Sequence, residues 1–233
     1  MKDILLQDPP CRVRVSVNAR AKRFTLRLET TGDAVVTVPP GVPASDTRMF
    51  LMRHSDWLHK ALARRPNRVE MVDGAELPID GVLRQIRVDD GKRAAPVLAG
   101  NVLTVRGDGQ LGPRIGAWLK MRARDRLFPS ARQYARKLGK SINAISLRDT
   151  TSRWGSCSSR GNLNFSWRLA MAPVEVQDYV AAHEAAHLVE MNHSDRYWAT
   201  LARIMPDYQT HRDWLKREGR GLHAYRFEAE QQK

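Results

Sequence analysis

The five residues His183-Glu184-Ala185-Ala186-His187 constrain the fold of this chain more than any other segment, because their chemistry requires a helix. They fit the pattern His-Glu-x-x-His. On a helix, residues four apart differ by roughly 400° of rotation, so both imidazoles lie on one face and can bind a single zinc ion, with Glu184 beside them. Pro173 suits the first position of that helix, which we expect to run towards Met191. The competing interpretation is that the two histidines pair with each other or with acids on a helix surface.

A catalytic zinc ion usually has three protein ligands and one open position, and two residues compete for the third place. Glu190 would share the histidine face on an unbroken helix. His193 lies ten residues after His183, about 15 Å along a straight axis, and reaches the same ion only if the chain turns. Asn192 tolerates the left-handed conformation that ends helices, and Ser194 or Asp195 can cap a new helix. We therefore predict that His193 completes the site.

These residues predict a hydrolytic mechanism. Three neutral imidazoles around zinc lower the pKa of a bound water to roughly 7, and a nearby carboxylate can take its proton as the water attacks a carbonyl. Glu184 is predicted to be this catalytic base. The resulting oxyanion needs a further donor, for which the sequence offers four candidates without ranking them: Arg153, Tyr197, His211 and His223. Ser156, in the same loop as Arg153, is a further candidate for substrate contact.

Up to residue 112 the chain shows the period-two alternation of short strands, which we expect to be linked as hairpins around one helix near residues 45–62. Asp80-Gly81 lies between two apolar runs and is a strong hairpin turn. Glycines and Pro113 then mark a boundary, and a helix-like stretch from Ile115 to Leu138 follows, with Pro129 kinking or dividing it. We predict an α+β fold with two domains. The first is an N-terminal β-rich region (1–112), and the second is a core with an active-site helix and a small sheet (113–233).

The charge balance points to an anionic partner. The chain has 39 Lys and Arg against 25 Asp and Glu, which gives a net charge of +14. Nine basic residues and one acid lie between Arg114 and Lys140, so +8 of the total is concentrated there. A nucleic acid is one interpretation of this stretch, and a solvated helix face is the other. On the first interpretation we predict weak nucleic-acid binding through Arg114 to Lys140, without sequence preference.

The number of cysteines and the hydropathy of the chain favour a reducing compartment and a chain without a membrane span. Two cysteines, Cys11 and Cys157, cannot form a disulfide framework and favour a reducing environment. No run approaches the roughly 20 apolar residues of a membrane span, and the first ten residues are too acidic and their apolar patch too short for a signal peptide. We expect a cytoplasmic protein that does not associate with membranes.

Four segments carry a resemblance to a known family: residues 153–159, 162–165, 183–187 and 192–194 together with Trp198. They are similar to the YgjP-like metallopeptidase domain family, which is related to the SprT-type and WLM-type zincins, and the likeness extends to residues 20–23 and 38–41 near the start of the chain. The resemblance implies a zincin-like metallopeptidase core, in which the metal lies under the edge strand of a small sheet. It also implies His183, His187 and His193 as zinc ligands and Glu184 as the catalytic acid and base. The family often has Leu where this chain has Ala185, a departure that leaves the metal site intact.

Three functions remain open at this point. The leading one is a zinc-dependent hydrolase, a metallopeptidase acting on a peptide or protein. The second is a metal-dependent nucleotide phosphohydrolase, which Arg153 and the basic excess favour. The third is a nucleic-acid-binding module with structural zinc, or, by analogy with SprT-type and WLM-type relatives, a protease associated with nucleic acid. A saturated four-ligand site would favour the module, whereas an open position beside Glu184 favours hydrolysis.

Overall fold

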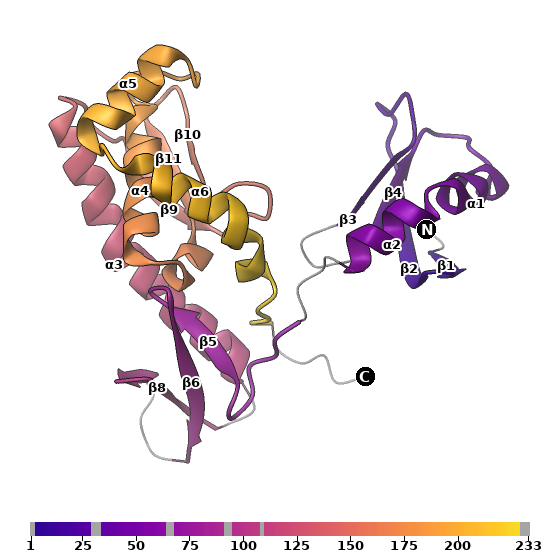
Figure 1. The fold of residues 1–233 in the computed structure, drawn as a ribbon, viewed down its shortest axis with the longest axis horizontal. Helices are drawn as coiled ribbons and strands as arrows, with labels where there is room; N and C mark the ends of the chain where they lie inside the picture. Colours follow the sequence, from indigo (N-terminus) through magenta and orange to yellow (C-terminus); the bar gives the residue numbers. More distant parts are fainter. Residues whose placement is uncertain (1–2, 29–33, 64–67, 91–94, 108–109, 229–233) are drawn as a thin grey trace. The chain divides into compact units, whose positions relative to one another are not determined.

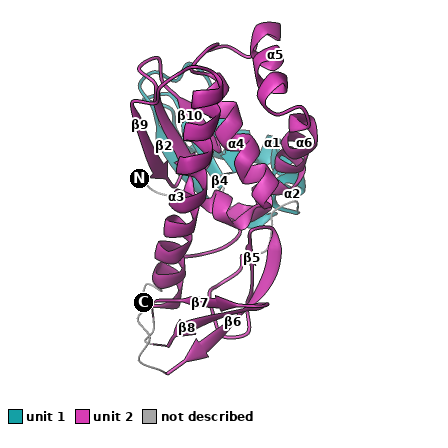
Figure 2. Ribbon diagram, turned by 90° about the vertical axis from the view of Figure 1, so that its left-hand side faces the viewer, with its two compact units in different colours: residues 1–67 teal, residues 68–233 magenta. Residues whose placement is uncertain are grey.

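The computed structural model describes residues 3–28, 34–63, 68–90, 95–107 and 110–228. The chain forms two compact units, unit 1 (Met1–Asn67) and unit 2 (Arg68–Lys233), which Figure 2 shows in different colours. Helices and sheets occur in both units, and the fold class is α+β, as predicted. Among the helices of the described ranges, none combines the length and hydropathy that a membrane span requires.

Unit 1 is a four-stranded sheet with two helices on one of its faces (Figure 1). In chain order its elements are β1 (Ile4–Gln7), β2 (Pro10–Val17), β3 (Thr25–Leu28), β4 (Ala34–Val38), α1 (Ala44–Arg53) and α2 (Ser55–Ala63). The apolar core of the unit lies between the sheet and the helices, where Val13 and Val36 meet Leu51 and Leu58. Alternation along each strand therefore places one set of side chains in this core and the other set on the opposite face.

The hairpin prediction is confirmed for β3 and β4, which are consecutive and pair in antiparallel fashion, but it is wrong for β2 and β3, which do not pair with each other. The order across the sheet is β1-β2-β4-β3, and β2 pairs with β4 in parallel, with Val15 opposite Val36. All five residues of β4 are buried, which suits a strand between two neighbours rather than one at an edge. Since the burial of both faces of β4 depends on the tertiary arrangement, local alternation did not reveal its place in the sheet.

Unit 2 begins with a second four-stranded sheet. Its strands are β5 (Glu76–Ile79), β6 (Val82–Asp89), β7 (Val97–Ala99) and β8 (Val102–Arg106), in the order β5-β6-β8-β7. The predicted Asp80-Gly81 turn is confirmed, because β5 and β6 pair in antiparallel fashion around it. Both turn residues have positive φ, 51° for Asp80 and 81° for Gly81, as a two-residue hairpin turn requires.

The sequence placed the domain boundary after residue 112, whereas the two compact units divide between Asn67 and Arg68. The reason lies in the core of unit 2. Leu77, Ile86 and Leu103 from the sheet of β5–β8 belong to the same hydrophobic cluster as Ile115 and other residues of the following helix. Strand β8 and the following helix therefore share one core, and Gly112 lies within that helix and not in a linker between two domains.

A long helix and a small sheet frame the rest of unit 2. The elements are α3 (Leu111–Lys137), β9 (Ala144–Arg148), β10 (Gly155–Cys157), β11 (Asn162–Ser166), a 3-10 helix (Trp167–Met171), α4 (Val174–Ala186), α5 (Asp195–Ile204), α6 (Tyr208–Glu218) and a 3-10 helix (Gly219–His223). Helix α3 runs unbroken through Pro129, so the proline does not divide it. The small sheet has the order β10-β11-β9, which leaves β10 at an edge (Figure 1).

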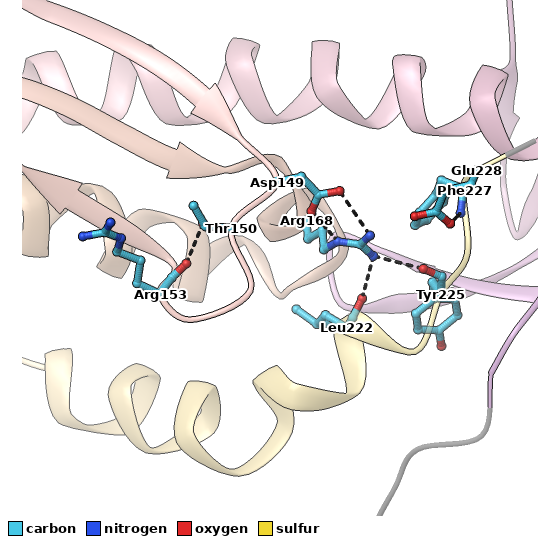
Figure 3. A network of polar contacts seen from close by, with 8 residues as sticks. All are labelled: Asp149, Thr150, Arg153, Arg168, Leu222, Tyr225, Phe227 and Glu228. Carbon is cyan, nitrogen blue, oxygen red and sulfur yellow. Dashed lines mark hydrogen bonds and ion pairs between the residues drawn. The ribbon is translucent and has the colours of Figure 1, made fainter. Parts of the chain in front are cut away.

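The two ends of unit 2 are joined to each other. The Val69 amide donates to the Ala224 carbonyl (3.1 Å), and the Arg226 amide donates to the Val69 carbonyl (2.9 Å). The buried guanidinium of Arg168 fixes the same C-terminal segment: it pairs with Asp149 (2.7 Å) and donates to the carbonyls of Leu222 (3.3 Å) and Tyr225 (3.0 Å), as Figure 3 shows. These bonds close the unit where the chain enters and leaves it.

Candidate metal centre

Helix α4 carries the first two histidines of the site. It begins at Val174, so Pro173 is the capping residue before the helix and not its first residue as predicted, and its last helical residue is Ala186, several residues before Met191. His183 and His187 are four residues apart and their ring centroids lie 5.1 Å apart, because this spacing places side chains on one helix face. His187 occupies the capping position, where the helix gives way to a turn.

The turn after α4 brings His193 back to the helix. The Glu190 amide donates to the carbonyl of Ala186 (3.1 Å), and the hydroxyl of Ser194 accepts from the Tyr197 amide (3.4 Å) at the start of α5. The Ser194 cap is confirmed. The left-handed Asn192 is not: among the described non-glycine residues only Asp80 has positive φ, and the helix has already ended before Asn192.

The three histidines form one group. Their ligand nitrogens all lie within 4.8 Å of one another, and Nε2 of His193 is 3.1 Å from Nε2 of His183. The carboxylate of Glu190 is not part of this group within the described residues. Glu190 instead uses its backbone carbonyl, which accepts from Nδ1 of His187 (3.0 Å). This bond places the proton of His187 on Nδ1 and leaves the Nε2 lone pair for a metal.

Aromatic side chains hold the other two rings. The Tyr179 hydroxyl lies 3.3 Å from Nδ1 of His183, one helical turn earlier on α4. The Trp198 ring stacks on His193 with centroids 5.4 Å apart, and Tyr208 also stacks on Trp198, with centroids 5.6 Å apart. The orientation of each imidazole is thus fixed by a partner outside the group, as is usual for metal-ligating histidines.

Burial sets the charge of the site. It lowers the pKa of His183 to about 3, with a smaller contribution from the two neighbouring histidines, and it also lowers the pKa of His187. Neutral imidazoles are the form that binds a metal. Burial raises the pKa of Glu184 to about 8, while the positive charge of Arg153 acts in the opposite direction. Oε2 of Glu184 is buried without a hydrogen-bond partner among the described residues.

A divalent transition metal fits these residues. Three imidazole nitrogens from one compact group match the ligand preference of zinc and its neighbours, and three protein ligands leave one position of a four-coordinate metal open. A buried carboxylate oxygen without a partner is costly unless another group completes its hydrogen bonding. The adjoining carboxylate and the three imidazoles together therefore form a centre suited to a metal and to a water molecule beside it.

The edge strand β10 packs directly against Glu184. A Cβ atom built on Gly155 would lie 2.6 Å from Cγ and 2.7 Å from Cδ of Glu184, and closer still to Oε1. No side chain can occupy that position without displacing the carboxylate. Two residues further, burial raises the pKa of the Cys157 thiol to about 11, with a further contribution from Glu184, which favours the protonated and weakly nucleophilic form.

The structure separates the residues predicted to contact substrate. Arg153 is exposed in the loop before β10, where its carbonyl accepts from the Thr150 hydroxyl (2.8 Å, Figure 3), and its charge acts on Glu184. Tyr197 is fully buried, and its hydroxyl donates to the backbone carbonyl of His183 (3.0 Å). Ser156 accepts from the Asn164 amide (3.2 Å), and as the neighbour of Gly155 in the strand it faces away from Glu184. Of the three, Arg153 is exposed, whereas the contacts of Tyr197 and Ser156 are with the protein itself.

Neither of the other two predicted donors is directed at the site by its contacts. His211 pairs with Asp207 on the surface of α6 (3.1 Å). His223 is buried and stacks on the Trp154 ring with centroids 4.8 Å apart, and burial lowers its pKa to about 4. Both side chains are engaged in local structure.

Sequence reasoning missed two residues that shape the centre. Tyr179 lies four residues before His183, so the helical spacing that pairs the histidines could have identified it as well. Gly155 was harder to identify from the sequence, because glycine is common in loops before strands. The need for glycine at this position is apparent only from the packing of the strand against Glu184.

A helix-borne His-Glu-x-x-His site joined by a third histidine is the arrangement of a metallopeptidase. The comparison with known families agrees. The family description YgjP-like, metallopeptidase domain, matches residues 22–218 of the 233 residues, and the chain belongs to this family. No curated protein and no solved structure matches the chain.

Proposed function

We propose that this protein is a zinc-dependent metallopeptidase of the zincin type, with His183, His187 and His193 as zinc ligands and Glu184 as general base. One observation carries the proposal: three imidazoles converge within 4.8 Å beside a buried carboxylate oxygen that has no partner among the described residues. When bound, zinc supplies Lewis acidity that polarises a carbonyl and makes water nucleophilic near neutral pH.

Glu184 performs the proton transfers in this proposal. Its free Oε2 accepts a proton from the attacking water and then donates it to the leaving amine as the peptide bond breaks. The carboxylate stays in place because Gly155 lies against it on one side and its helix is packed in the core on the other. Arg153 is the group we assign to stabilise the developing oxyanion, since it is exposed and its charge reaches Glu184.

The substrate in this proposal is an extended peptide segment. Strand β10 is the edge of the small sheet, and among the described residues its backbone pairs on one side only. An extended chain can add to such an edge through main-chain hydrogen bonds. The scissile bond would then pass beside Gly155, where Glu184 lies on the neighbouring helix.

Arg153 also supports a second candidate, a metal-dependent nucleotide phosphohydrolase, because an exposed guanidinium whose charge acts on Glu184 suits a phosphate as well as an oxyanion. A third proposal concerns the basic stretch from Arg114 to Lys140. All of it except its last three residues lies on α3, whose buried face packs in the core and whose exposed face carries Arg124, Arg126 and Arg132. This face would bind nucleic acid weakly if the peptidase acts on proteins that are bound to nucleic acid.

We also propose a cytoplasmic location, since both cysteines are free thiols.

A side-by-side activity screen tests these candidates. The zinc-loaded protein, the chelator-treated protein and the Glu184→Gln variant would each be incubated with denatured casein, a DNA-bound protein and nucleoside triphosphates. Metal-dependent cleavage of polypeptide that Glu184→Gln loses supports the peptidase. Release of phosphate from the nucleotides with intact polypeptides would replace it with the phosphohydrolase.

A further inference from the structure

Unit 1 contains a basic pocket that the metallopeptidase chemistry does not use. Its volume is about 430 Å³, and all the residues that line it belong to β2, β3, β4 and the loop between β2 and β3. We propose that this pocket binds the phosphodiester backbone of a nucleic acid without reading its bases.

A row of hydroxyl groups forms the floor of the pocket. Ser16 on β2 is directly opposite Thr37 on β4, and Thr37 is directly opposite Thr25 on β3. Three residues in register across neighbouring strands point to the same face, with about 4.8 Å between strands. The floor therefore offers a line of donors to an elongated ligand lying across the strands.

Cationic side chains form the wall. Arg20, Lys22 and Arg23 project from the loop after β2, and all three are exposed. The loop itself is ordered by Asn18, whose side chain accepts from the Arg20 amide (2.9 Å) and whose carbonyl accepts from the Ala21 amide (3.0 Å). Within the described residues, no ion pair occupies these three cations.

The pocket lies on the face of the sheet away from α1 and α2. Those helices pack on the Val13 and Val36 side, whereas Ser16 and Thr37 belong to the alternate set. Phe24 is the chain neighbour of two lining residues, but it does not itself line the pocket, and its ring stacks on Phe50 of α1 with centroids 5.0 Å apart. Among the described lining residues there is accordingly neither an aromatic ring for base stacking nor a carboxylate.

This composition selects the ligand. Arg, Lys, Ser, Thr and Asn are the side chains that contact phosphate oxygens, and such contacts carry no sequence information. A nucleic acid presents one negative charge per roughly 3.4 Å of each strand, which suits several cations around one elongated floor. Proteins that bind single strands also use aromatic side chains on which the bases stack. Because the described lining residues include no aromatic ring, we expect binding without base preference.

Fluorescence anisotropy with the full-length protein tests the proposal. The probes are labelled single-stranded and double-stranded DNA of about 20 nucleotides per strand, measured from about 50 to 200 mM salt. Three double charge reversals, each on exposed side chains, change the net charge equally: Arg20→Glu/Arg23→Glu in the pocket, Arg48→Glu/Arg53→Glu on α1, and Arg126→Glu/Arg132→Glu on α3. Circular dichroism confirms folding, and Arg20→Gln/Arg23→Gln replaces the pocket variant if it fails to fold.

We expect the pocket variant to bind at least about tenfold more weakly than the wild type. The slope of log affinity against log salt should become shallower by about 1.4 on single strands and by about 1.8 on duplex, because two phosphate contacts are lost in each case. The α1 variant should bind nearly as the wild type does. Equal losses of affinity in the pocket and α1 variants would show that binding depends only on net charge, and this result would also overturn the proposal. A loss confined to the α3 variant, or wild-type binding by the pocket variant, would overturn the proposal.

Discussion

The contact between Gly155 and Glu184 makes Gly155→Ala a test of the proposed general base. The added Cβ would lie 2.3 Å from Oε1 and 2.6 Å from Cγ of Glu184, whereas ordinary van der Waals contact begins at 3.4 Å, so the carboxylate must move by about 1.1 Å. A displacement of about 1 Å at a catalytic group can cost about 100-fold in rate. We therefore expect kcat/KM to fall about 100-fold, which corresponds to about 2.7 kcal/mol of transition-state stabilisation.

The assay is hydrolysis of the substrate that the activity screen identifies, together with zinc content by elemental analysis. Zinc content should stay at the wild-type level, because the nearest atoms to the new Cβ all belong to Glu184 and none to a histidine. Gly221→Ala is the matched control, since a Cβ at Gly221 meets nothing within 4 Å.

A double variant separates positioning from general destabilisation. If Gly155→Ala acts through Glu184, it should cause little further loss in a Glu184→Gln background, because the group that it displaces no longer works as a base. Wild-type kcat/KM in Gly155→Ala, or a full 100-fold additional loss in the double variant, would refute this reasoning.

The remaining predictions concern the metal, the base and the closure of unit 2. Glu184→Gln should retain zinc and lose hydrolysis by about 10²- to 10⁴-fold, the usual contribution of a general base, and turnover at the wild-type rate would exclude the mechanism. His193→Ala should lose most of the bound zinc in elemental analysis while Glu190→Ala keeps it, and the reverse result would assign the third ligand to Glu190. Arg168→Met should lower the free energy of unfolding by about 3 kcal/mol in urea titrations, because Asp149 and two backbone carbonyls lose a charged donor. A loss below about 1 kcal/mol would show that water replaces the guanidinium.

Short-range rules predicted the parts of the structure that are decided locally. Asp80-Gly81 makes its hairpin turn because both residues accept positive φ, and this property depends on the dipeptide itself. The convergence of His193 with the helix histidines followed from counting residues along a helix axis, and Ser194 supplied the cap that the turn needs. These are consequences of chain geometry within about a dozen residues.

Long-range packing decided the rest. Nothing in the alternation of β2 indicates that Val15 pairs in parallel with Val36, because that pairing depends on where β3 returns along the sheet. The boundary near residue 112 failed for a related reason: Leu103 and Ile115 share a core although glycines lie between them. Tyr197 was a candidate substrate contact by residue type, and only its burial under His183 shows that it supports the histidine instead.

The pairing of Val69 with the segment at Tyr225 has a consequence for how this protein can be taken apart and how it can evolve. A unit whose own first and last residues pair with each other needs no neighbour to complete its backbone, so it can be excised, transplanted or fused at that single point. Expression of residues 68–228 alone should accordingly give a soluble, metal-competent module. In a lineage, the same feature lets an N-terminal unit be exchanged for another without altering the histidine centre.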